Sequence, residues 1–292
     1  MYATDFAYHA PASLREVVAL LQQGDPNGGE VKVLAGGQSL IPLLKLRMAA
    51  PAALVDLRNV AELRGISEEG DGIVIGAATT YFQTIDSPVV QRRCPLLVQA
   101  ISQVGDPQVR ARGTVGGSLA HADPAGDLPA VAVALDAELR AVGPNGQRTI
   151  AAKDFFVDLL TTSLDPAEVL TAVKFAATDR PHTGTSYQKH RHPASGYAVV
   201  GVAAVVMLND DGTVHGARIG VTGAGAHAAR ASGVEQAIAG KTLDDATLTS
   251  AVASVTDGME LMSDTYASSE YRAHLARVLT KRALLDAAAR AR

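Results

Sequence analysis

The stretch Ala35-Gly36-Gly37-Gln38-Ser39 follows an apolar segment, and a second stretch, Thr114-Val115-Gly116-Gly117-Ser118, follows a turn-like one. Each contains a glycine pair, ends in serine and leads into a hydrophobic segment. Glycine adopts positive φ angles and lets a ligand approach the backbone closely. Successive exposed N–H groups then form a concave site for a phosphate group, often at a helix N-terminus. Two such loops in one chain predict a site for the two phosphates of a dinucleotide, with a plain tight turn as the alternative for each glycine pair.

Neither stretch is a common phosphate motif, because the chain has no G-x-G-x-x-G after its first predicted strand and no G-x-x-x-x-G-K-[ST]. Two arginines, Arg110 and Arg112, precede the second stretch, and an acidic, proline-rich run over 121–129 follows it. In this run Asp123 and Asp127 have two interpretations. They cap helices, or they offer carboxylates to ribose hydroxyl groups.

The composition narrows the class of protein. The chain has 292 residues, of which 47% are hydrophobic, so it can form two or three subdomains with cores of their own. A net charge of -4 without a basic block argues against nucleic acid or an anionic membrane as a partner. The N-terminus lacks the pattern of a secretory signal, and the most apolar run, 197–208, is too short to span a bilayer. We therefore expect a soluble, cytoplasmic protein.

The single cysteine, Cys94, excludes an internal disulfide and a cysteine-ligated iron–sulfur cluster, which needs four thiolates. Its apolar surroundings predict a buried thiol. His190-Arg191-His192 would place both imidazoles on one strand face, but no cysteine or carboxylate cluster completes a metal site there. We expect a solvated polar pair and no metal in this chain.

Apolar periodicity and turn signals predict the elements. A first helix begins with the Ser13–Glu16 capping box and ends at Gly24. Further helices are expected over 40–48, 95–104, around 128–135, and over 233–239, 246–259 and 268–289. Strands are expected over 31–34, 53–57, 73–79, 137–142, 169–175, 185–190, 197–208 and 217–222. The turn 143–146 would join strands 137–142 and 169–175, the turn 209–212 would close a hairpin, and 178–185 would be a linker.

Five motifs, in this order, give the chain a resemblance to a known family. They are the stretches 35–42, 110–118, 122–129, 195–198 and 270–279. Together they resemble the FAD-binding medium subunits of molybdenum hydroxylases, the group of the carbon monoxide dehydrogenase flavoprotein and the flavin domain of xanthine dehydrogenase. The resemblance spans nearly the whole chain. It departs from many relatives at Gln38 and Asp106, where they have His, and at Ala111, where they have Asn.

The resemblance implies an α+β fold of the vanillyl-alcohol-oxidase type. Two α+β subdomains, 1–58 and 59–177, would clamp FAD, and residues 178–292 would form a C-terminal antiparallel sheet with a helical bundle. The backbone amides of both glycine pairs would hold the pyrophosphate. Asp127 would lie at the cofactor with Asp123 as a weaker candidate, Leu170 and Lys189 would line the flavin site, and Tyr197 would pack near the isoalloxazine ring unless it is a core residue. The full set of implied cofactor contacts is Lys32, Leu34, Ala35, Gly36, Gly37, Gln38, Ser39, Leu40, Thr114, Gly116, Gly117, Ser118, Asp123, Asp127, Leu170, Lys189 and Tyr197.

The implied function is electron transfer. A large molybdopterin subunit would oxidise the substrate, and a small subunit with two [2Fe-2S] clusters would pass electrons to noncovalently bound FAD in this chain, which would deliver them to an external acceptor. The complex would be a dimer of heterotrimers, with no catalytic residue in this chain. Two alternatives stay open: a stand-alone flavin reductase or oxidase, and a non-redox nucleotide-binding assembly module.

Overall fold

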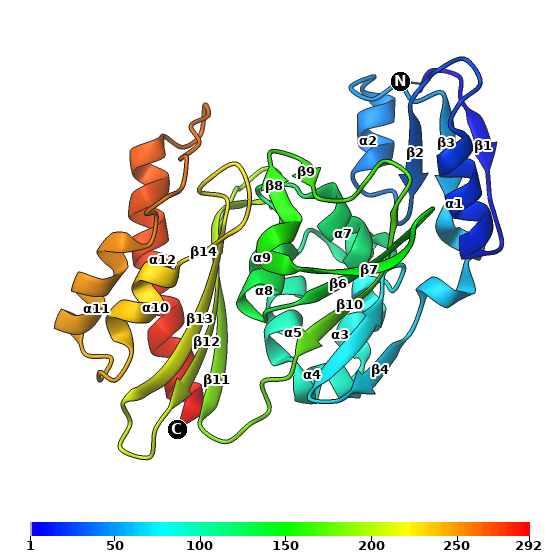
Figure 1. Cartoon of the computed structure of the whole chain (residues 1–292). Helices are drawn as coiled ribbons and strands as arrows, with labels where there is room; N and C mark the ends of the chain where they lie inside the picture. The colour runs from blue at the N-terminus through cyan, green and yellow to red at the C-terminus, as the bar shows by residue number, and fades with distance from the viewer. Residues whose placement is uncertain (1) are drawn as a thin grey trace.

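The computed structural model describes residues 2–292, and in this part of the chain three larger β-sheets follow one another in sequence (Figure 1). The first has the order β1-β3-β2, with β1 (Ala7–His9) and β2 (Val31–Leu34) both parallel to β3 (Ala53–Asp56). Helix α1 (Leu14–Gln23) packs on this sheet through Val17 and Leu21. Helix α2 (Leu40–Lys45) follows the first glycine pair.

The start and end of α1 are as predicted. The Ser13 hydroxyl accepts a hydrogen bond from the backbone N–H of Glu16 at 3.3 Å, and Gly24 ends the helix with a φ of 64°. The reciprocal bond of the predicted capping box differs, because the Glu16 carboxylate accepts from the N–H of Ala12 at 3.0 Å and not from that of Ser13. Helix α2 is shorter than predicted, because the chain leaves the helix at Leu46 and takes a φ of 58° at Arg47.

The second sheet is antiparallel, with the order β4-β5-β10-β6-β7. Its strands are β4 (Ile66–Glu69), β5 (Gly72–Gly76), β6 (Glu138–Gly143), β7 (Gly146–Ala151) and β10 (Val169–Ala176). Helices cover one face: α3 (Tyr81–Asp86), α4 (Pro88–Arg93), α5 (Pro95–Ile101), α6 (Pro107–Arg112), α7 (Val115–His121), α8 (Asp127–Ala134) and the short α9 (Ala152–Phe155). A small hairpin of β8 (Phe156–Asp158) and β9 (Thr161–Thr162) follows α9.

One connection in this sheet differs from the prediction. The turn 143–146 joins β6 to β7, a strand that the sequence analysis missed, and does not lead to β10. In strand β7 only Ile150 is buried, and every other position is exposed. The sequence of this strand therefore lacks the apolar alternation by which strands are predicted. Strand β10 pairs with the other edge of β6 instead.

The third sheet has the order β11-β12-β13-β14 and is also antiparallel. Its strands are β11 (Thr183–Arg191), β12 (Ala198–Leu208), β13 (Val214–Thr222) and β14 (Ala229–Arg230). Helices α10 (Ser232–Ile238), α11 (Asp245–Ala251) and α12 (Ser269–Ala291) lie on its outer face (Figure 1). The helix predicted over 246–259 ends at Ala251 and is followed by a 3-10 turn, Val252–Ser254.

Strand β12 is apolar throughout because both of its faces are buried. Ala203 and Val205 belong to the core that includes α5 and α8, whereas Val202 and Val206 belong to the core under α12. This alternation with a period of two explains why the run 198–208 reads as continuously hydrophobic. Helix α8, buried at all eight positions, lies between the second and third sheets and fixes their relative positions. The subdomain boundaries 58 and 177 stay predictions.

Candidate FAD site

A cleft of about 760 Å³ lies between the first sheet unit and the helices of the second. Such a volume is in the range of roughly 300–1,000 Å³ typical of small-molecule sites. Its walls come from the loop after β2, the first turn of α7, the Val104–Gly105 turn and the 195–197 segment before β12. Apolar side chains of Leu160, Leu164 and Leu170 line it as well.

The loop after β2 has unpaired backbone donors. Among the described residues, the N–H groups of Gly36, Gly37, Gln38 and Ser39 donate no hydrogen bond. Gly37 has a φ of 76°, a conformation that glycine adopts without strain, and it turns the chain from the strand into α2. Consecutive unpaired N–H groups around such a turn form a concave anion site.

The second glycine pair has a different structure from the one predicted. Gly116 and Gly117 lie in the first turn of helix α7, not in a loop, and Thr114 is the residue that caps this helix. The Gly116 N–H donates to the carbonyl of Ala77 at 2.9 Å, and the Gly117 N–H donates to the Thr114 hydroxyl at 3.1 Å. The Ser118 N–H donates to the Thr114 carbonyl at 3.1 Å, so these three donors already have partners within the protein.

The structure also shows why glycine is needed at Gly36 and Gly116. A Cβ atom at Gly36 would lie 2.2 Å from the carbonyl oxygen of Arg112, and one at Gly116 would lie 2.4 Å from the Cβ atom of Ala77. Neither has a positive φ. These glycines permit close packing of protein on protein: the first holds the loop against the end of α6, and the second holds α7 against the end of β5.

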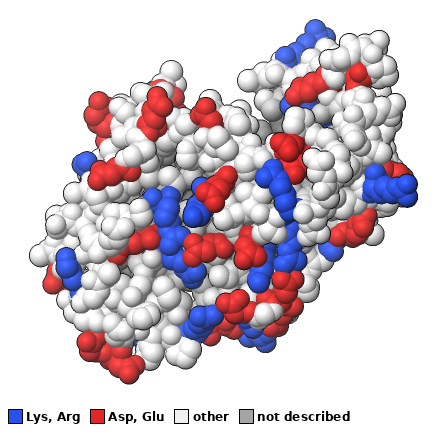
Figure 2. Space-filling view, in the orientation of Figure 1, with Lys and Arg blue, Asp and Glu red and all other residues white. Residues whose placement is uncertain are grey.

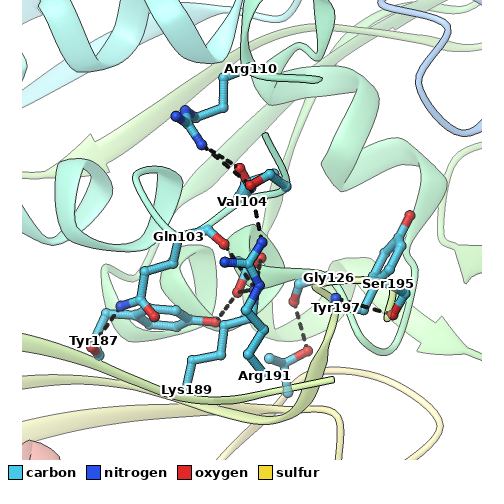
Figure 3. Close-up of polar contacts among 12 residues, drawn as sticks. Gln103, Val104, Arg110, Gly126, Tyr187, Lys189, Arg191, Ser195 and Tyr197 are labelled. Atoms are coloured by element: carbon cyan, nitrogen blue, oxygen red, sulfur yellow. Dashed lines mark hydrogen bonds and ion pairs between the residues drawn. The ribbon is translucent and has the colours of Figure 1, made fainter. Parts of the chain in front are cut away.

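Asp127 opens helix α8 and is 6% exposed. Its carboxylate accepts a hydrogen bond from the Tyr187 hydroxyl at 2.5 Å, and the Lys189 ammonium lies 2.8 Å from Oδ1 and 2.9 Å from Oδ2 (Figure 3). Lys189, with a side chain only 1% exposed, also donates to the carbonyl of Gln103 at 3.2 Å. Burial raises the pKa of the Asp127 carboxyl, while Lys189 and Tyr187 act against this shift by stabilising the ionised form.

Cationic side chains also hold the Val104–Gly105 turn at the cleft wall (Figure 3). The Arg110 guanidinium donates to the carbonyl of Val104 at 2.8 Å, and Arg191 donates to the carbonyl of Gly105 at 3.2 Å. Together with the bond from Lys189 to Gln103, three consecutive carbonyls are held by residues from α6 and β11. This part of the wall is therefore held in place by side chains from a helix that covers the second sheet and from a strand of the third sheet.

Tyr197 lines the cleft and is 42% exposed, so it is not a core residue. Its backbone N–H donates to the Ser195 hydroxyl at 3.4 Å, directly before β12 begins. Partial burial raises the pKa of its hydroxyl, and a hydrogen bond with Ser39 opposes this shift. The ring thus lies close to the loop that follows β2.

Most of the predicted contacts meet in this cleft. They are Lys32, Ala35, Gly36, Gly37, Gln38, Ser39, Leu40, Thr114, Gly116, Gly117, Ser118, Asp123, Asp127, Leu170 and Tyr197. Leu34 and Lys189 lie outside the lining. The Leu34 side chain is buried against Leu44 and Leu54, and the Lys189 ammonium pairs with the carboxylate of Asp127. Direct contact with a ligand stays a prediction for every member of this set.

Two residues near the cleft escaped the sequence analysis. Tyr81 lines the cleft from α3 and is 6% exposed, and Tyr187 holds Asp127. Tyr187 precedes Lys189 by two positions on one strand, so the alternation of strand faces would have placed both on the same side. Nothing in the local sequence marks Tyr81, which packs as a core residue.

Asp123, Asp106 and the His190–His192 pair have local partners. The Asp123 carboxylate accepts from the backbone N–H of Ala125 at 2.8 Å, and Asp106, one of the departures from the family pattern, caps α6 by accepting from Val109 at 2.9 Å. The predicted common face of His190 and His192 is wrong. His192 lies beyond the end of β11, and the two rings pack on different tyrosines. Among residues 2–292, no group of three or more His, Cys, Asp or Glu could hold a metal ion.

Residues 4–176 match the family described as the FAD binding domain in molybdopterin dehydrogenase, and residues 185–287 match the carbon monoxide dehydrogenase flavoprotein C-terminal domain. The chain belongs to this family of FAD-binding medium subunits. It is 40% identical to the carbon monoxide dehydrogenase medium chain of Hydrogenophaga pseudoflava, over 98% of each chain. It is 35% identical to the 6-hydroxypseudooxynicotine dehydrogenase complex subunit alpha of Paenarthrobacter nicotinovorans, over 100% of this chain and 97% of the relative.

The solved structure of carbon monoxide dehydrogenase from Hydrogenophaga pseudoflava superposes with a TM-score of 0.94, covering 99% of both chains. The predicted fold class, α+β with FAD-binding subdomains and a C-terminal antiparallel sheet, is confirmed by this match. The relatives are subunits of oxidoreductases, and this family places the chain among them. In the described part of the chain, no helix combines the length and the apolar character needed to cross a membrane.

The distribution of charged side chains on the surface agrees with the absence of a basic block from the sequence. On the face shown in Figure 2, basic and acidic side chains alternate, and no extended basic block lies over the elements of this face. This distribution differs from the positive stripe typical of nucleic-acid-binding domains.

Proposed function

We propose that this chain binds FAD noncovalently in the cleft, takes electrons from the [2Fe-2S] clusters of a small partner subunit and passes them to an external acceptor. The observation that carries the proposal is the row of unpaired N–H groups from Gly36 to Ser39 in a cleft of about 760 Å³. This row and volume fit a dinucleotide, and the family match gives the cofactor its identity.

The pyrophosphate belongs at the first loop in this proposal. Its four N–H groups have no acceptor within the described chain, whereas those of Gly116, Gly117 and Ser118 are bonded to Ala77 and Thr114. An anion gains most from donors that would otherwise bond only to water. Helix α7 then closes the cleft opposite the loop and supplies shape more than hydrogen bonds.

Asp127 and Tyr197 orient the cofactor's other groups. Lys189 and Tyr187 hold the buried Asp127 carboxylate in one position, so it can accept a hydrogen bond from a donor in the cleft at a fixed point. Tyr197 would cover one side of the flavin ring and limit the approach of small molecules. FAD supplies the redox chemistry itself, and the chain supplies position and electrostatics.

The electron source is another chain in this proposal. Cys94 is the only cysteine, it is buried, and burial raises its pKa to about 12, so it is an inert thiol and cannot build an iron–sulfur cluster. We propose a large molybdopterin subunit and a small iron–sulfur subunit, assembled as a dimer of heterotrimers. A cytoplasmic location is part of the same proposal, in keeping with a chain that can form no internal disulfide.

The visible spectrum of the purified chain tests the cofactor. Oxidised flavin bands that disappear on addition of dithionite support FAD binding, and a colourless chain that takes up no FAD on reconstitution contradicts it. The electron path is tested by mixing the FAD-loaded chain with its reduced iron–sulfur partner in a stopped-flow instrument. Bleaching of the flavin bands supports the path, whereas substrate oxidation by the chain alone would favour the stand-alone reductase or oxidase.

A further inference from the structure

A second, smaller hollow adjoins the large cleft at the Ala35–Gly36 backbone. It has a volume of about 190 Å³, and its polar lining includes the side chains of Arg58, Arg64, Gln83 and Arg112. It shares Ala35, Gly36, Leu57 and Thr114 with the large cleft, but none of its arginines lines that cleft. Its lining contains three arginines and no carboxylate.

Among residues 2–292, the three arginines of this hollow have only one carboxylate partner, Asp56, which pairs with Arg58. Asp56, which is 1% exposed, accepts from Arg58 Nε at 2.6 Å and also from the Tyr8 hydroxyl at 2.8 Å. Arg64 spends one N–H group on the carbonyl of Arg58 at 2.7 Å. Arg112 makes no side-chain hydrogen bond or ion pair with any residue of 2–292, so two guanidinium charges lack a carboxylate partner here.

A neutral donor, the Gln83 side chain, also lines this hollow. The Gln83 side-chain oxygen accepts from the backbone N–H and the hydroxyl of Thr80, at 3.0 and 3.1 Å, in the capping box of α3. This leaves the Gln83 NH₂ group without an acceptor in the described chain. The lining therefore offers donors from three segments, the turns after β3, the start of α3 and the end of α6, and contains no carboxylate to pair with them.

We propose that this hollow binds a tetrahedral oxyanion with two negative charges, of the class of phosphate, at Arg58, Arg64, Arg112 and Gln83. Guanidinium groups bind phosphate oxygens bidentately, and two unmatched positive charges fit a dianion. The volume lies below the roughly 300 Å³ of a site for a whole small molecule, so the hollow takes the anion alone or the phosphate group of a larger ligand.

The position of the site links it to the first glycine loop. The Arg112 backbone carbonyl packs against Gly36, and the Arg112 side chain lines the hollow. A bound oxyanion joins Arg112 at the end of α6 to Arg64 in the segment after β3. It thereby fixes the segment on which the proposed pyrophosphate loop rests. This inference adds to the proposed function and does not need FAD binding to be correct.

Isothermal titration of the full chain with inorganic phosphate tests the site, in FAD-free and FAD-loaded protein. We expect saturable binding with a Kd below about 10 mM in both forms. Arg112→Gln and Arg64→Gln should each weaken it about tenfold or more, the loss of one charge-assisted contact. Arg277→Gln removes an exposed arginine of α12 that has no ion-pair partner among residues 2–292, and it should leave phosphate binding unchanged.

Three outcomes overturn the proposal: no saturable binding, equal affinity in Arg112→Gln and wild type, or loss of phosphate binding once FAD is loaded. The last would place the phosphate in the large cleft. Phenyl phosphate distinguishes the two sources of the anion. Binding as tight as that of inorganic phosphate indicates a phosphate group on a larger ligand, and binding of inorganic phosphate alone indicates the free ion. A chain that fails to bind FAD but binds phosphate through Arg112 contradicts the proposed function only.

Discussion

Replacing Lys189 by methionine tests the buried pair behind the cleft. The substitution keeps the length and packing of the side chain but removes the charge that lies 2.8 Å from Asp127. Asp127 is 6% exposed and the Lys189 side chain 1%. Removing one partner of such a pair leaves an uncompensated buried charge, and the measured cost in other proteins is about 3–5 kcal/mol. We expect the free energy of unfolding of Lys189→Met to fall by about this amount near pH 8.

The destabilisation caused by Lys189→Met should depend on pH, in a direction set by the raised pKa of the Asp127 carboxyl group. Without Lys189, burial holds the pKa of Asp127 further above the value of about 3.9 that it has in the unfolded chain. At intermediate pH the folded variant then binds a proton that the unfolded chain does not. The destabilisation is therefore largest above the folded pKa, and it shrinks as the pH falls toward the unfolded pKa. The double variant Asp127→Asn/Lys189→Met lacks the carboxyl group and should not show this dependence.

Urea denaturation of the FAD-free chain, followed by circular dichroism at several pH values, measures both effects. Lys281→Met is the matched control, because Lys281 pairs with Asp245 at 2.6 Å while the Asp245 side chain is 87% exposed. An exposed pair of this kind contributes about 0–1 kcal/mol. Two results would refute this reasoning. One is a loss of unfolding free energy in Lys189→Met no larger than in Lys281→Met, and the other is a loss that stays the same at every pH.

Further predictions concern the cleft. Gly37→Ala should lower FAD affinity at least about tenfold, because the φ of 76° at Gly37 strains an alanine within the row of N–H donors. Gly28→Ala has the same φ but lies outside the cleft lining, so it should leave fluorescence-monitored FAD binding unchanged. Tyr197→Ala should retain FAD but change its visible spectrum and speed its reoxidation by small acceptors, and an unchanged spectrum with a lower melting temperature would assign Tyr197 a packing role. Acid precipitation should release all flavin into the supernatant, and yellow precipitated protein would contradict noncovalent binding.

The sequence predicted the elements whose burial pattern is regular. Strand β12 and helix α1 fall within one or two residues of expectation, because apolar periodicity and the Ser13 cap specify them. Polar or short elements were missed. Strand β7 is exposed along nearly its whole length, and helix α6 buries no side chain, although Asp106 and Pro107 carry the start signals of a helix. Local propensity alone does not reveal such elements, since they form through pairing and capping with neighbours.

The site was predictable in outline from motifs, but its internal contacts depend on residues far apart in sequence. Lys189 and Asp127 are separated by 62 positions, and their pairing requires β11 to pass the start of α8. A motif can therefore mark both residues as belonging to the site without telling which one faces the cleft. The structure assigns that position to Asp127 and places Lys189 behind it.

The two glycine pairs show most clearly where sequence reasoning ends. Each lies in a stretch that ends in serine and leads into an apolar segment, and both look like anion loops. What separates them is the acceptor that the rest of the fold brings to each: Ala77, at the end of β5, takes the N–H of Gly116, and the Thr114 hydroxyl takes that of Gly117. Within the described chain, no carbonyl or hydroxyl accepts a hydrogen bond from the N–H groups of Gly36 to Ser39. A pattern of glycines fixes how closely a backbone can be approached, but the partners of its N–H groups decide whether a ligand or the protein itself makes that approach.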